Sequence, residues 1–412
     1  MTRKSNHPGR ASRSVIVALT LYVLTLPGIA VAQESEATNE SQAADNNNGA
    51  TWENDFGAKV RVNLFHKSWK EDHVVDLDFE TVVLTLDTRY DRFSGSVDYR
   101  FYNGYNMLRY GYVSYAFPGG SELRGGIHRK PFGLLPFASH SYFFDLGFYL
   151  GMEDDADLGV KWVLPSGPAE FQIAYYRTDE GSYFGNSIDS SRYSYDLVQT
   201  SVSELGLASV PGELANVERD QFNGRAALKK DHGNVGATEF GVSAEFGGIY
   251  NSVTDRTGTH WATAVHVDGN YGPFNLQFEG IRFQFRPENP VGADRRFVIM
   301  GAYDGPYKIA SEGWIALANL AYSVPLQSRW MDSLTLYGNY GYLRKSEDSF
   351  ADTQQVVLGS MIGAGRVLLF VDTALGKNHP WISANYGSGL AEGDANAEWE
   401  WRFNVNMSFR IF

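Results

Sequence analysis

From Glu398 to the end of the chain, apolar residues fall on every second position and mostly polar side chains fill the others. The apolar set is Trp399, Trp401, Phe403, Val405, Met407, Phe409 and Ile411. Because successive side chains of a strand point to opposite faces, this segment predicts a strand with one apolar and one polar face. Phe412 has the parity of the polar face, so we expect a bulge or a frayed end there.

Alternating segments of this kind recur from about Gly57 onward. Candidate strands begin near Lys59, Thr81, Phe93, Leu108, Ser121, Asp157, Ala169, Gln221, Thr238, His260, Pro273, Arg295, Gly313, Asp332, Thr353, Arg366 and Glu398. Bacterial outer-membrane barrels have an even number of such strands, apolar outside and polar inside. The odd number of candidates therefore contains an error, and the parity switch near Glu80 makes 74–90 its expected source. We predict an all-β fold, a transmembrane antiparallel β-barrel over 57–412, with sixteen strands rather than eighteen.

The N-terminus has the pattern of a secretory signal. Basic residues precede an apolar run from Val15 to Leu26, and Ala30-Val31-Ala32 forms a small-x-small cleavage site. We expect residues 1–32 to be a signal peptide and the polar, aperiodic segment 33–56 to be a flexible periplasmic leader. An anchoring helix is the alternative, but the apolar run is short and Pro27-Gly28 interrupts it.

Composition and charge agree with a membrane barrel. The chain has no cysteine, 43 glycines and 14% aromatic residues, although a soluble β-helix or sandwich shares some of these traits. Removal of the signal leaves 31 Lys and Arg against 48 Asp and Glu, a formal charge of −17, so we expect no nucleic-acid partner. The expected location is the bacterial outer membrane. The expected partners are membrane lipid and lipopolysaccharide, small hydrophilic solutes, and further copies of the chain in a homotrimer.

The connections between candidate strands alternate between short and long, as turns and loops do on the two sides of an outer-membrane barrel. Pro118-Gly119-Gly120 and the Pro165–Pro168 run predict tight turns. The long connections are expected over 131–156, 179–219, 287–294 and 377–397.

Strand parity identifies the side chains that face the barrel interior. Leu123 lies on the lipid side of its strand, for example, so its neighbour Arg124 faces inward. The predicted pore-lining residues are Lys59, Arg61, Arg100, Arg124, His128, Lys130, Lys161, Arg225 and Arg402. Other inward positions, such as Ala262 and Ala264, are small and would leave room for water, as expected for a sixteen-stranded barrel. A barrel filled by its own loops is the alternative.

The connection 131–156 is too apolar for a solvent-exposed loop. Folding into the barrel would cover its large apolar side chains: Phe132, Leu134, Phe137, Tyr142, Phe143, Phe144, Phe148 and Tyr149. It would also bring four acidic residues of a constriction loop, Glu153, Asp154, Asp155 and Asp157, close to the basic wall. Opposed charges across a constriction create a transverse field that sorts solutes by charge and dipole. Alternatively, the aromatic residues cap the rim or bury a trimer contact.

The stretch from Gly126 to Gly133, GIHRKPFG, resembles the entry to the inward loop in the phosphate-selective porin O/P family, where a K-x-P-F-G type run occurs. The resemblance implies a trimeric sixteen-stranded barrel in which arginines and lysines feed a narrow anion site. It also implies that Arg124 and Lys130 are pore-lining bases. The acidic net charge of this chain departs from what an anion-selective protein suggests.

The expected function is therefore that of a porin: a water-filled channel for passive diffusion of small hydrophilic solutes, with anions such as phosphate as one candidate class. A sugar-selective porin is an alternative, and a structural or adhesive barrel or a rim hydrolase is an alternative of another class. No catalytic residue and no cofactor is expected, since the histidines lack metal or triad spacing. Calcium at 153–157 is chemically conceivable, but a solvated or ion-paired acidic patch is favoured over a metal site.

Overall fold

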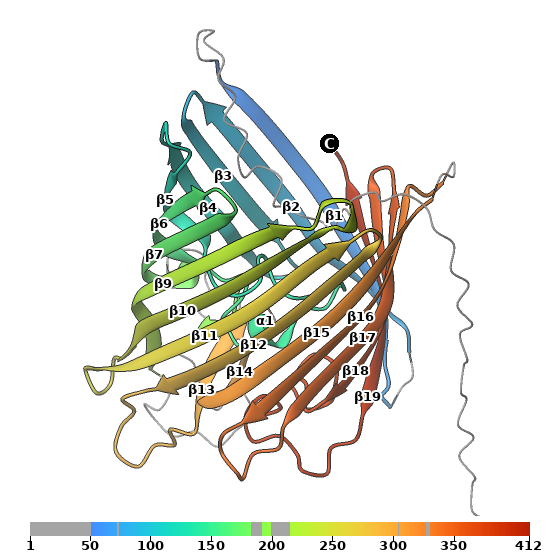
Figure 1. Cartoon of the computed structure of the whole chain (residues 1–412). Helices are drawn as coiled ribbons and strands as arrows, with labels where there is room; N and C mark the ends of the chain where they lie inside the picture. The colour runs from blue at the N-terminus through green and yellow to red at the C-terminus, as the bar shows by residue number, and fades with distance from the viewer. Residues whose placement is uncertain (1–50, 72–73, 183–191, 199–214, 304, 327–329) are drawn as a thin grey trace, which may run out of the picture.

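The computed structural model describes residues 51–412 except 72–73, 183–191, 199–214, 304 and 327–329. The predicted signal peptide and all but the end of the predicted leader lie outside these residues. In the described chain, sixteen antiparallel strands close into a barrel, in which β1 pairs with both β2 and the C-terminal strand β19 (Figure 1). The predicted fold class and the count of sixteen are confirmed.

The barrel strands follow the chain order except where connections fold inward. They are β1 Glu53–Lys67, β2 Asp76–Tyr90, β3 Phe93–Phe101, β4 Asn106–Ala116, β5 Glu122–Arg129, β6 Ala156–Ser166, β7 Ala169–Asp179, β9 Asn216–Asp231, β10 Ala237–Asn251, β11 Arg256–Tyr271, β12 Phe274–Arg286, β15 Glu312–Pro325, β16 Ser333–Lys345, β17 Thr353–Ala364, β18 Val367–Lys377 and β19 Glu400–Arg410. The elements outside the barrel are α1 Leu146–Tyr149, β8 Asp196–Leu197, β13 Phe297–Ala302, β14 Gly305–Ala310, and the 3-10 turns η1 Glu180–Ser182 and η2 Gly233–Val235.

The outer face of the barrel is apolar, as strand parity predicts. Large hydrophobic side chains with outward parity, such as Val97, Val160, Trp162 and Met407, are exposed, while the polar residues between them are covered. Exposed apolar surface of this extent around a closed sheet needs lipid as its solvent. The barrel therefore belongs in the bacterial outer membrane. No helix in the described part of the chain is long and apolar enough to cross a membrane.

One of the seventeen candidate strands was wrong, and it was not the suspected one. The segment from Arg295 forms β13, which pairs with β14 and β8 in a separate three-stranded sheet and takes no place in the barrel. The parity switch near Glu80 is a β-bulge within a single strand, since Arg61 pairs with Thr81 while Val62 pairs with Phe79. A bulge inserts one residue and reverses the inward and outward parity beyond it.

Connections at one end of the barrel, the turn end, are short, and those at the other, the loop end, include all the long ones. The predicted tight turns lie between β4 and β5 and between β6 and β7, where Gly167 has a positive φ of 61°. The connection expected over 287–294 extends over 287–311, because it includes β13 and β14. At the C-terminus β19 ends at Arg410, which leaves Ile411 and Phe412 outside the strand and accounts for the parity of Phe412.

Four connections from the loop end fold into the barrel and pack together. They are the loop 130–155, the described parts of the connection 180–215, the β13–β14 hairpin, and the segment 378–399; we call them the inner plug. β13 pairs with β8, Ala310 N donates to Leu390 O at 2.8 Å, and Tyr307 Oη donates to Tyr149 O at 2.5 Å. Hydrogen bonds between segments far apart in sequence thus join the four connections into one packed group.

Candidate functional site

The loop 130–155 crosses the barrel interior and is hydrogen-bonded to wall strands on its far side. Asn319 of β15 donates to Ala138 O at 2.6 Å, and Gln355 of β17 donates to Phe144 O at 2.8 Å. Asp372 of β18 accepts from Tyr142 N at 3.2 Å. These wall side chains satisfy backbone groups that have no ladder partner, so the middle of the loop is fixed to the far wall. Inward folding of this loop is confirmed.

Near its start the loop is fastened to β9 and β10. Gly133 N donates to Ser243 Oγ at 2.8 Å, and Arg225 Nε donates to Gly133 O at 2.9 Å. Gly133 has φ +62°, and a Cβ there would overlap the carboxylate of Glu153 and lie 2.5 Å from Glu279 Oε1. The glycine of the PFG run is therefore required both by its backbone conformation and by close approach.

The aromatic and aliphatic side chains of the loop are buried against the wall and the rest of the plug. The barrel interior thus covers them, as the sequence predicted. One core cluster joins Phe132, Leu134, Leu146 and Phe148 to the wall and to the other plug segments. Its wall members include Ala262, Ala264, Ile281, Phe283, Ile315 and Leu317. The small residues Ala262 and Ala264 were expected to leave room for water, and this expectation was wrong. The space beside them holds the loop.

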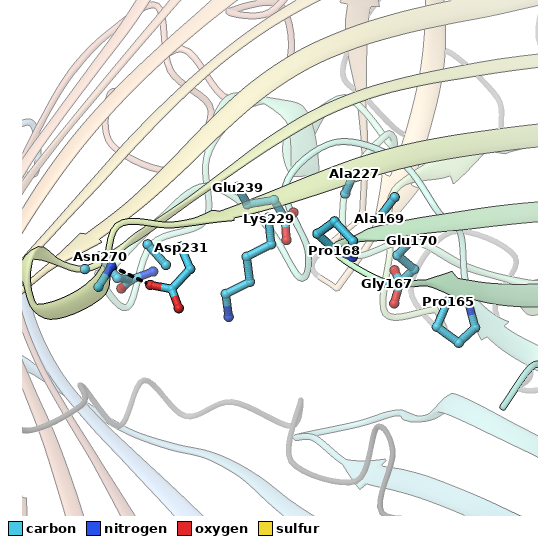
Figure 2. A pocket seen from close by; sticks show the side chains of 13 residues that line it. Pro165, Gly167, Pro168, Ala169, Glu170, Ala227, Lys229, Asp231, Glu239 and Asn270 are labelled. Carbon is cyan, nitrogen blue, oxygen red and sulfur yellow. Dashed lines mark hydrogen bonds between the residues drawn. The ribbon is translucent and has the colours of Figure 1, made fainter.

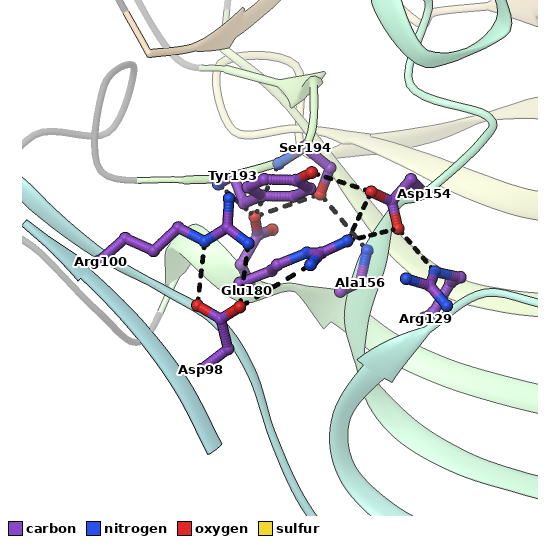
Figure 3. A network of polar contacts seen from close by, with 9 residues as sticks. Asp98, Arg100, Arg129, Asp154, Ala156, Glu180, Tyr193 and Ser194 are labelled. Carbon is purple, nitrogen blue, oxygen red and sulfur yellow. Dashed lines mark hydrogen bonds and ion pairs between the residues drawn. The ribbon is translucent and has the colours of Figure 1, made fainter. Parts of the chain in front are cut away.

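Around Asp98 and Asp154, arginines and carboxylates form a buried network (Figure 3). Arg100 donates to both oxygens of Asp98 at 2.9 Å, and Arg109 donates to both oxygens of Asp154 at 3.1 and 2.8 Å. Tyr193 donates its hydroxyl to Asp154 at 2.9 Å. Its ring lies 4.6 and 4.5 Å from the two guanidinium carbons, in cation–π contact with both. The wall base Arg100 and the loop acid Asp154 thus belong to one network.

Lys130 lies at the centre of a second charged group and is almost fully buried. Its ammonium contacts Asp155 and lies 3.9 Å from Asp157 and 3.7 Å from Glu245 of β10. Burial lowers the pKa of Lys130, but the surrounding carboxylates raise it more, so that the pKa lies well above its ordinary value. The lysine therefore remains charged and neutralises part of the acidic group around it.

The other predicted lining residues are distributed over the wall. Arg124 binds Glu122 through two hydrogen bonds of 2.7 and 3.1 Å, and Lys161 donates to Arg129 O at 3.0 Å. His128 lies 3.2 Å from the hydroxyl of Tyr176. Lys59, Arg61 and Arg402 lie on β1 and β19, where Arg61 is 3.9 Å from Glu80 and Arg402 packs over Phe65 and Phe143. Whether these residues border a conducting path stays a prediction.

Glu153 belongs to a group of carboxyls beneath the start of the loop. It accepts from Leu134 N at 3.1 Å, and Glu279 of β12 accepts from the same N–H at 3.3 Å. Asp145 caps α1 by accepting from Phe148 N at 2.9 Å. Burial and the neighbouring Asp145 and Glu279 raise the pKa of Glu153 well above its ordinary value. The surroundings of Glu153 therefore disfavour its charged form.

At the turn end of the barrel there is a hollow of about 730 Å³ (Figure 2). Glu170, Lys229, Asp231 and Glu239 line it, together with Ala227, Asn270 and residues of the two neighbouring turns: Pro165, Gly167, Pro168, Ala169, Gly233, Gly236 and Ala237. Arg225 extends from the same wall, and its guanidinium lies 2.5 Å from Glu239 and 3.6 Å from Glu170. The interior at this end thus carries charges of both signs in contact with solvent.

Several charged residues of these networks were missed by sequence reasoning. Arg109 lies at a bulge, because Asp98 pairs with Tyr110 while Tyr99 pairs with Leu108, and parity does not assign such a residue to a face. Tyr193 and Asp196 lie in a long connection that shows no periodicity and therefore gave no signal. Glu245 did lie on the inward parity of β10, and reading that strand residue by residue would have found it.

We expect Gly133→Ala to destabilise the protein more than Gly167→Ala. The two glycines share the same backbone conformation, with φ +62° and +61°, so the strain of a left-handed alanine, about 1–2 kcal/mol, is common to both. Only Gly133 lies against other groups, and a Cβ at Gly167 meets nothing within 4 Å. Overpacking should therefore add about 1–3 kcal/mol at Gly133, measured by urea unfolding in detergent micelles. Equal losses would mean that the loop start is not packed as described.

Known structures with a similar fold are outer-membrane proteins. An anion-selective porin from Comamonas acidovorans aligns with a TM-score of 0.55 and 13% identity, over 88% of this chain and 100% of that chain. The outer-membrane channel DcaP of Acinetobacter baumannii aligns with a TM-score of 0.54 and 13% identity, over 87% of this chain and 97% of that chain. The trimer form of OmpT, an outer-membrane protein of Vibrio cholerae, aligns with a TM-score of 0.53 and 13% identity, over 87% of this chain and 99% of that chain. At these identities the likeness shows the fold, which is that of bacterial outer-membrane porins.

No protein-family model and no curated protein matches the sequence. The resemblance to the phosphate-selective porin O/P family therefore rests on the GIHRKPFG stretch alone, whereas the wider porin fold rests on the whole barrel.

Proposed function

We propose that the protein is an outer-membrane porin through which small hydrophilic solutes diffuse passively. The observation that carries the proposal is the interior of the closed sixteen-stranded barrel: its wall is polar at the turn end, and an inward-folded loop crosses it. A barrel of this strand number is wide enough for an aqueous path. The solved structures of similar fold include an anion-selective porin and a channel, which supports the same function.

The inner plug makes the path narrow. Its loops fill the interior near the loop end with a packed apolar core, so solutes would pass between the plug and the wall rather than through a wide lumen. The first test is conductance of the purified protein in planar lipid bilayers. Discrete conductance steps are expected. A protein that is folded, as shown by its gel mobility, yet produces no steps would be a structural barrel closed by its own loops.

We further propose a preference for anions, with phosphate among the candidates. The support is the resemblance of the loop entry and the pairing of Arg124 opposite Lys161 on β5 and β6. Two bases at one level of the wall would attract anions. The opposing consideration is that Glu122 binds Arg124 directly, so the preference should be weak.

Reversal potential in a KCl gradient tests this preference with a matched pair of variants. Arg124→Gln should shift the potential toward cation selectivity and Glu122→Gln toward anion selectivity, because each removes one charge of the same ion pair. Lys130 is unsuitable for this test, since its removal leaves buried carboxylates unpaired. If both variants keep the wild-type potential, the inward face of β5 does not border the path.

We propose that the protein assembles as a homotrimer in a membrane of lipid and lipopolysaccharide. The support is the trimer form of the Vibrio cholerae protein of similar fold. The mass of the detergent-solubilised protein, measured by light scattering with the detergent contribution subtracted, should be that of three chains. A mass of one chain would contradict the trimer without affecting the channel proposal.

A further inference from the structure

Four carboxyl groups from three segments meet inside the barrel near the loop end. Asp155 ends the loop 130–155, Asp157 lies at the start of β6, Glu180 belongs to η1, and Asp196 belongs to β8. One oxygen of each lies within 4.8 Å of one oxygen of every other, and all four side chains are buried. Residues as far apart in the chain as Asp155 and Asp196 are thus held with their negative groups together, which is unfavourable unless positive charge balances them.

Hydrogen bonding in the described chain leaves part of this group unsatisfied. Asp196 is 0% exposed, and neither of its oxygens has a hydrogen-bond donor. Glu180 accepts from Tyr193 N at 3.0 Å with one oxygen, while its other oxygen has no donor. One oxygen of Asp157 is also without a donor. A buried acceptor without a donor costs about 1–3 kcal/mol, and more when it is charged, so these oxygens need a partner.

Nearby bases do not supply enough positive charge. Lys130 contacts Asp155, and Arg192 contacts Asp179 at 3.1 Å. The carboxyls that act on one another here also include three further buried groups: Asp179, Glu218 and Glu245. Among the described residues, two buried bases therefore face seven buried carboxyl groups. Buried carboxylates this close together repel one another, and a bound cation would offset that repulsion.

We propose that Asp155, Asp157, Glu180 and Asp196 bind a calcium ion. Carboxylate oxygens are the ligands that hard divalent cations take, and calcium accepts six to eight of them at about 2.3–2.6 Å. Ligands on opposite sides of calcium are then about 4.6–5.2 Å apart, which fits oxygens lying within 4.8 Å of one another. Magnesium keeps several waters and demands near-ideal octahedral geometry, which a buried group of four carboxylates suits less well than it suits calcium. Carboxylates that bind through both oxygens would complete the coordination.

The ion would fasten the inner plug to the wall. Asp157 is in a barrel strand, whereas Asp196 is in β8, whose pairing with β13 comprises only Met300 with Leu197 and Gly301 with Asp196. Calcium would thus join β6, η1 and β8 at one point and hold the described parts of the connection 180–215 inside the barrel. This role does not depend on channel activity, so it can be tested separately from the proposed function.

The test uses the full-length mature protein, refolded into detergent without lipopolysaccharide and freed of metal with EDTA. Calcium chloride is then titrated in a calorimeter, and thermal unfolding is followed by circular dichroism in EDTA and in calcium. We expect one calcium per chain and a higher Tm with calcium. Terbium is expected to occupy the same site and to luminesce on tyrosine excitation, since Tyr195 precedes Asp196 in the chain. A wild-type protein that binds no calcium and has the same Tm in both conditions would overturn the proposal.

Asp196→Asn is the decisive variant, because its two expected effects have opposite signs. Calcium affinity should fall by about 10-fold or more, since one charged ligand is lost. The Tm in EDTA should rise, because the variant removes a repelling charge. Asp231→Asn, which makes the same change at an exposed aspartate of the turn end, is the control and should keep wild-type affinity. Unchanged affinity in Asp196→Asn, or a lower Tm in EDTA, would overturn the site. Equal stabilisation by magnesium would overturn the choice of calcium.

Discussion

Single-channel conductance is expected to rise several-fold when residues 134–149 are removed. This segment carries α1 and the aromatic side chains that fill the interior, and Asn319, Gln355 and Asp372 fix it to the far wall. Its loss leaves that part of the cross-section to water, and the conductance of a pore increases with its narrowest area. Planar-bilayer recording of the deletion variant beside the wild type measures the effect directly.

Two controls make this experiment interpretable. Removal of Val291 and Gly292 shortens another loop-end connection at a fully exposed position and should leave conductance unchanged. Heat-dependent gel mobility must show that the 134–149 deletion variant is folded, because the deletion uncovers Ile281, Phe283 and Leu317. A folded variant with wild-type conductance would mean that the path does not pass this loop.

The barrel could be predicted from the sequence because a two-residue period is imposed by the boundary between lipid and the interior. Leu123, Trp162 and Met407 must face lipid, and their neighbours consequently face inward. β13 shows where this reasoning fails. It is a strand buried on both faces inside the plug, so it has strand-forming residues and no lipid face. The residue types and alternation of a segment predict that a strand forms, whereas the sheet that the strand joins depends on tertiary contacts.

The candidate site could be predicted only in part, for the same reason. The inward loop 130–155 could be predicted because its apolar residues needed cover. The inward bases Arg100, Arg124 and Lys130 could be predicted because strand parity points their side chains into the barrel. Their partners were expected across a water-filled constriction. Instead, Asp154 and Asp155 contact basic residues directly. The distances between these charges depend on how deep in the barrel the loop lies. Side-chain packing sets that depth, and the two-residue alternation of the strands carries no information about it.

Lys130→Met is expected to lower the free energy of unfolding by about 3–5 kcal/mol, the range for removing one partner of a buried ion pair. Lys130 is 2% exposed and its ammonium lies against Asp155, Asp157 and Glu245, so its loss leaves three buried carboxylates with less compensation. The raised pKa of Lys130 indicates that the charged form is the one the site stabilises. Urea unfolding in detergent micelles, followed by tryptophan fluorescence, gives the free energy.

Lys229→Met is the matched control for this substitution. Lys229 is exposed at the turn end, beside the hollow in Figure 2, and its replacement should change the free energy of unfolding by less than about 0.5 kcal/mol. Adding Asp155→Asn to Lys130→Met should recover part of the lost free energy of unfolding, because the added change removes one of the uncompensated charges. The expected coupling energy between the two substitutions is about 0.5–3 kcal/mol. If the double variant is no more stable than Lys130→Met, charge compensation by Lys130 is not what stabilises this end of the plug. The lysine would then act through the packing of its stem and its hydrogen bond to Gly151 O at 3.3 Å.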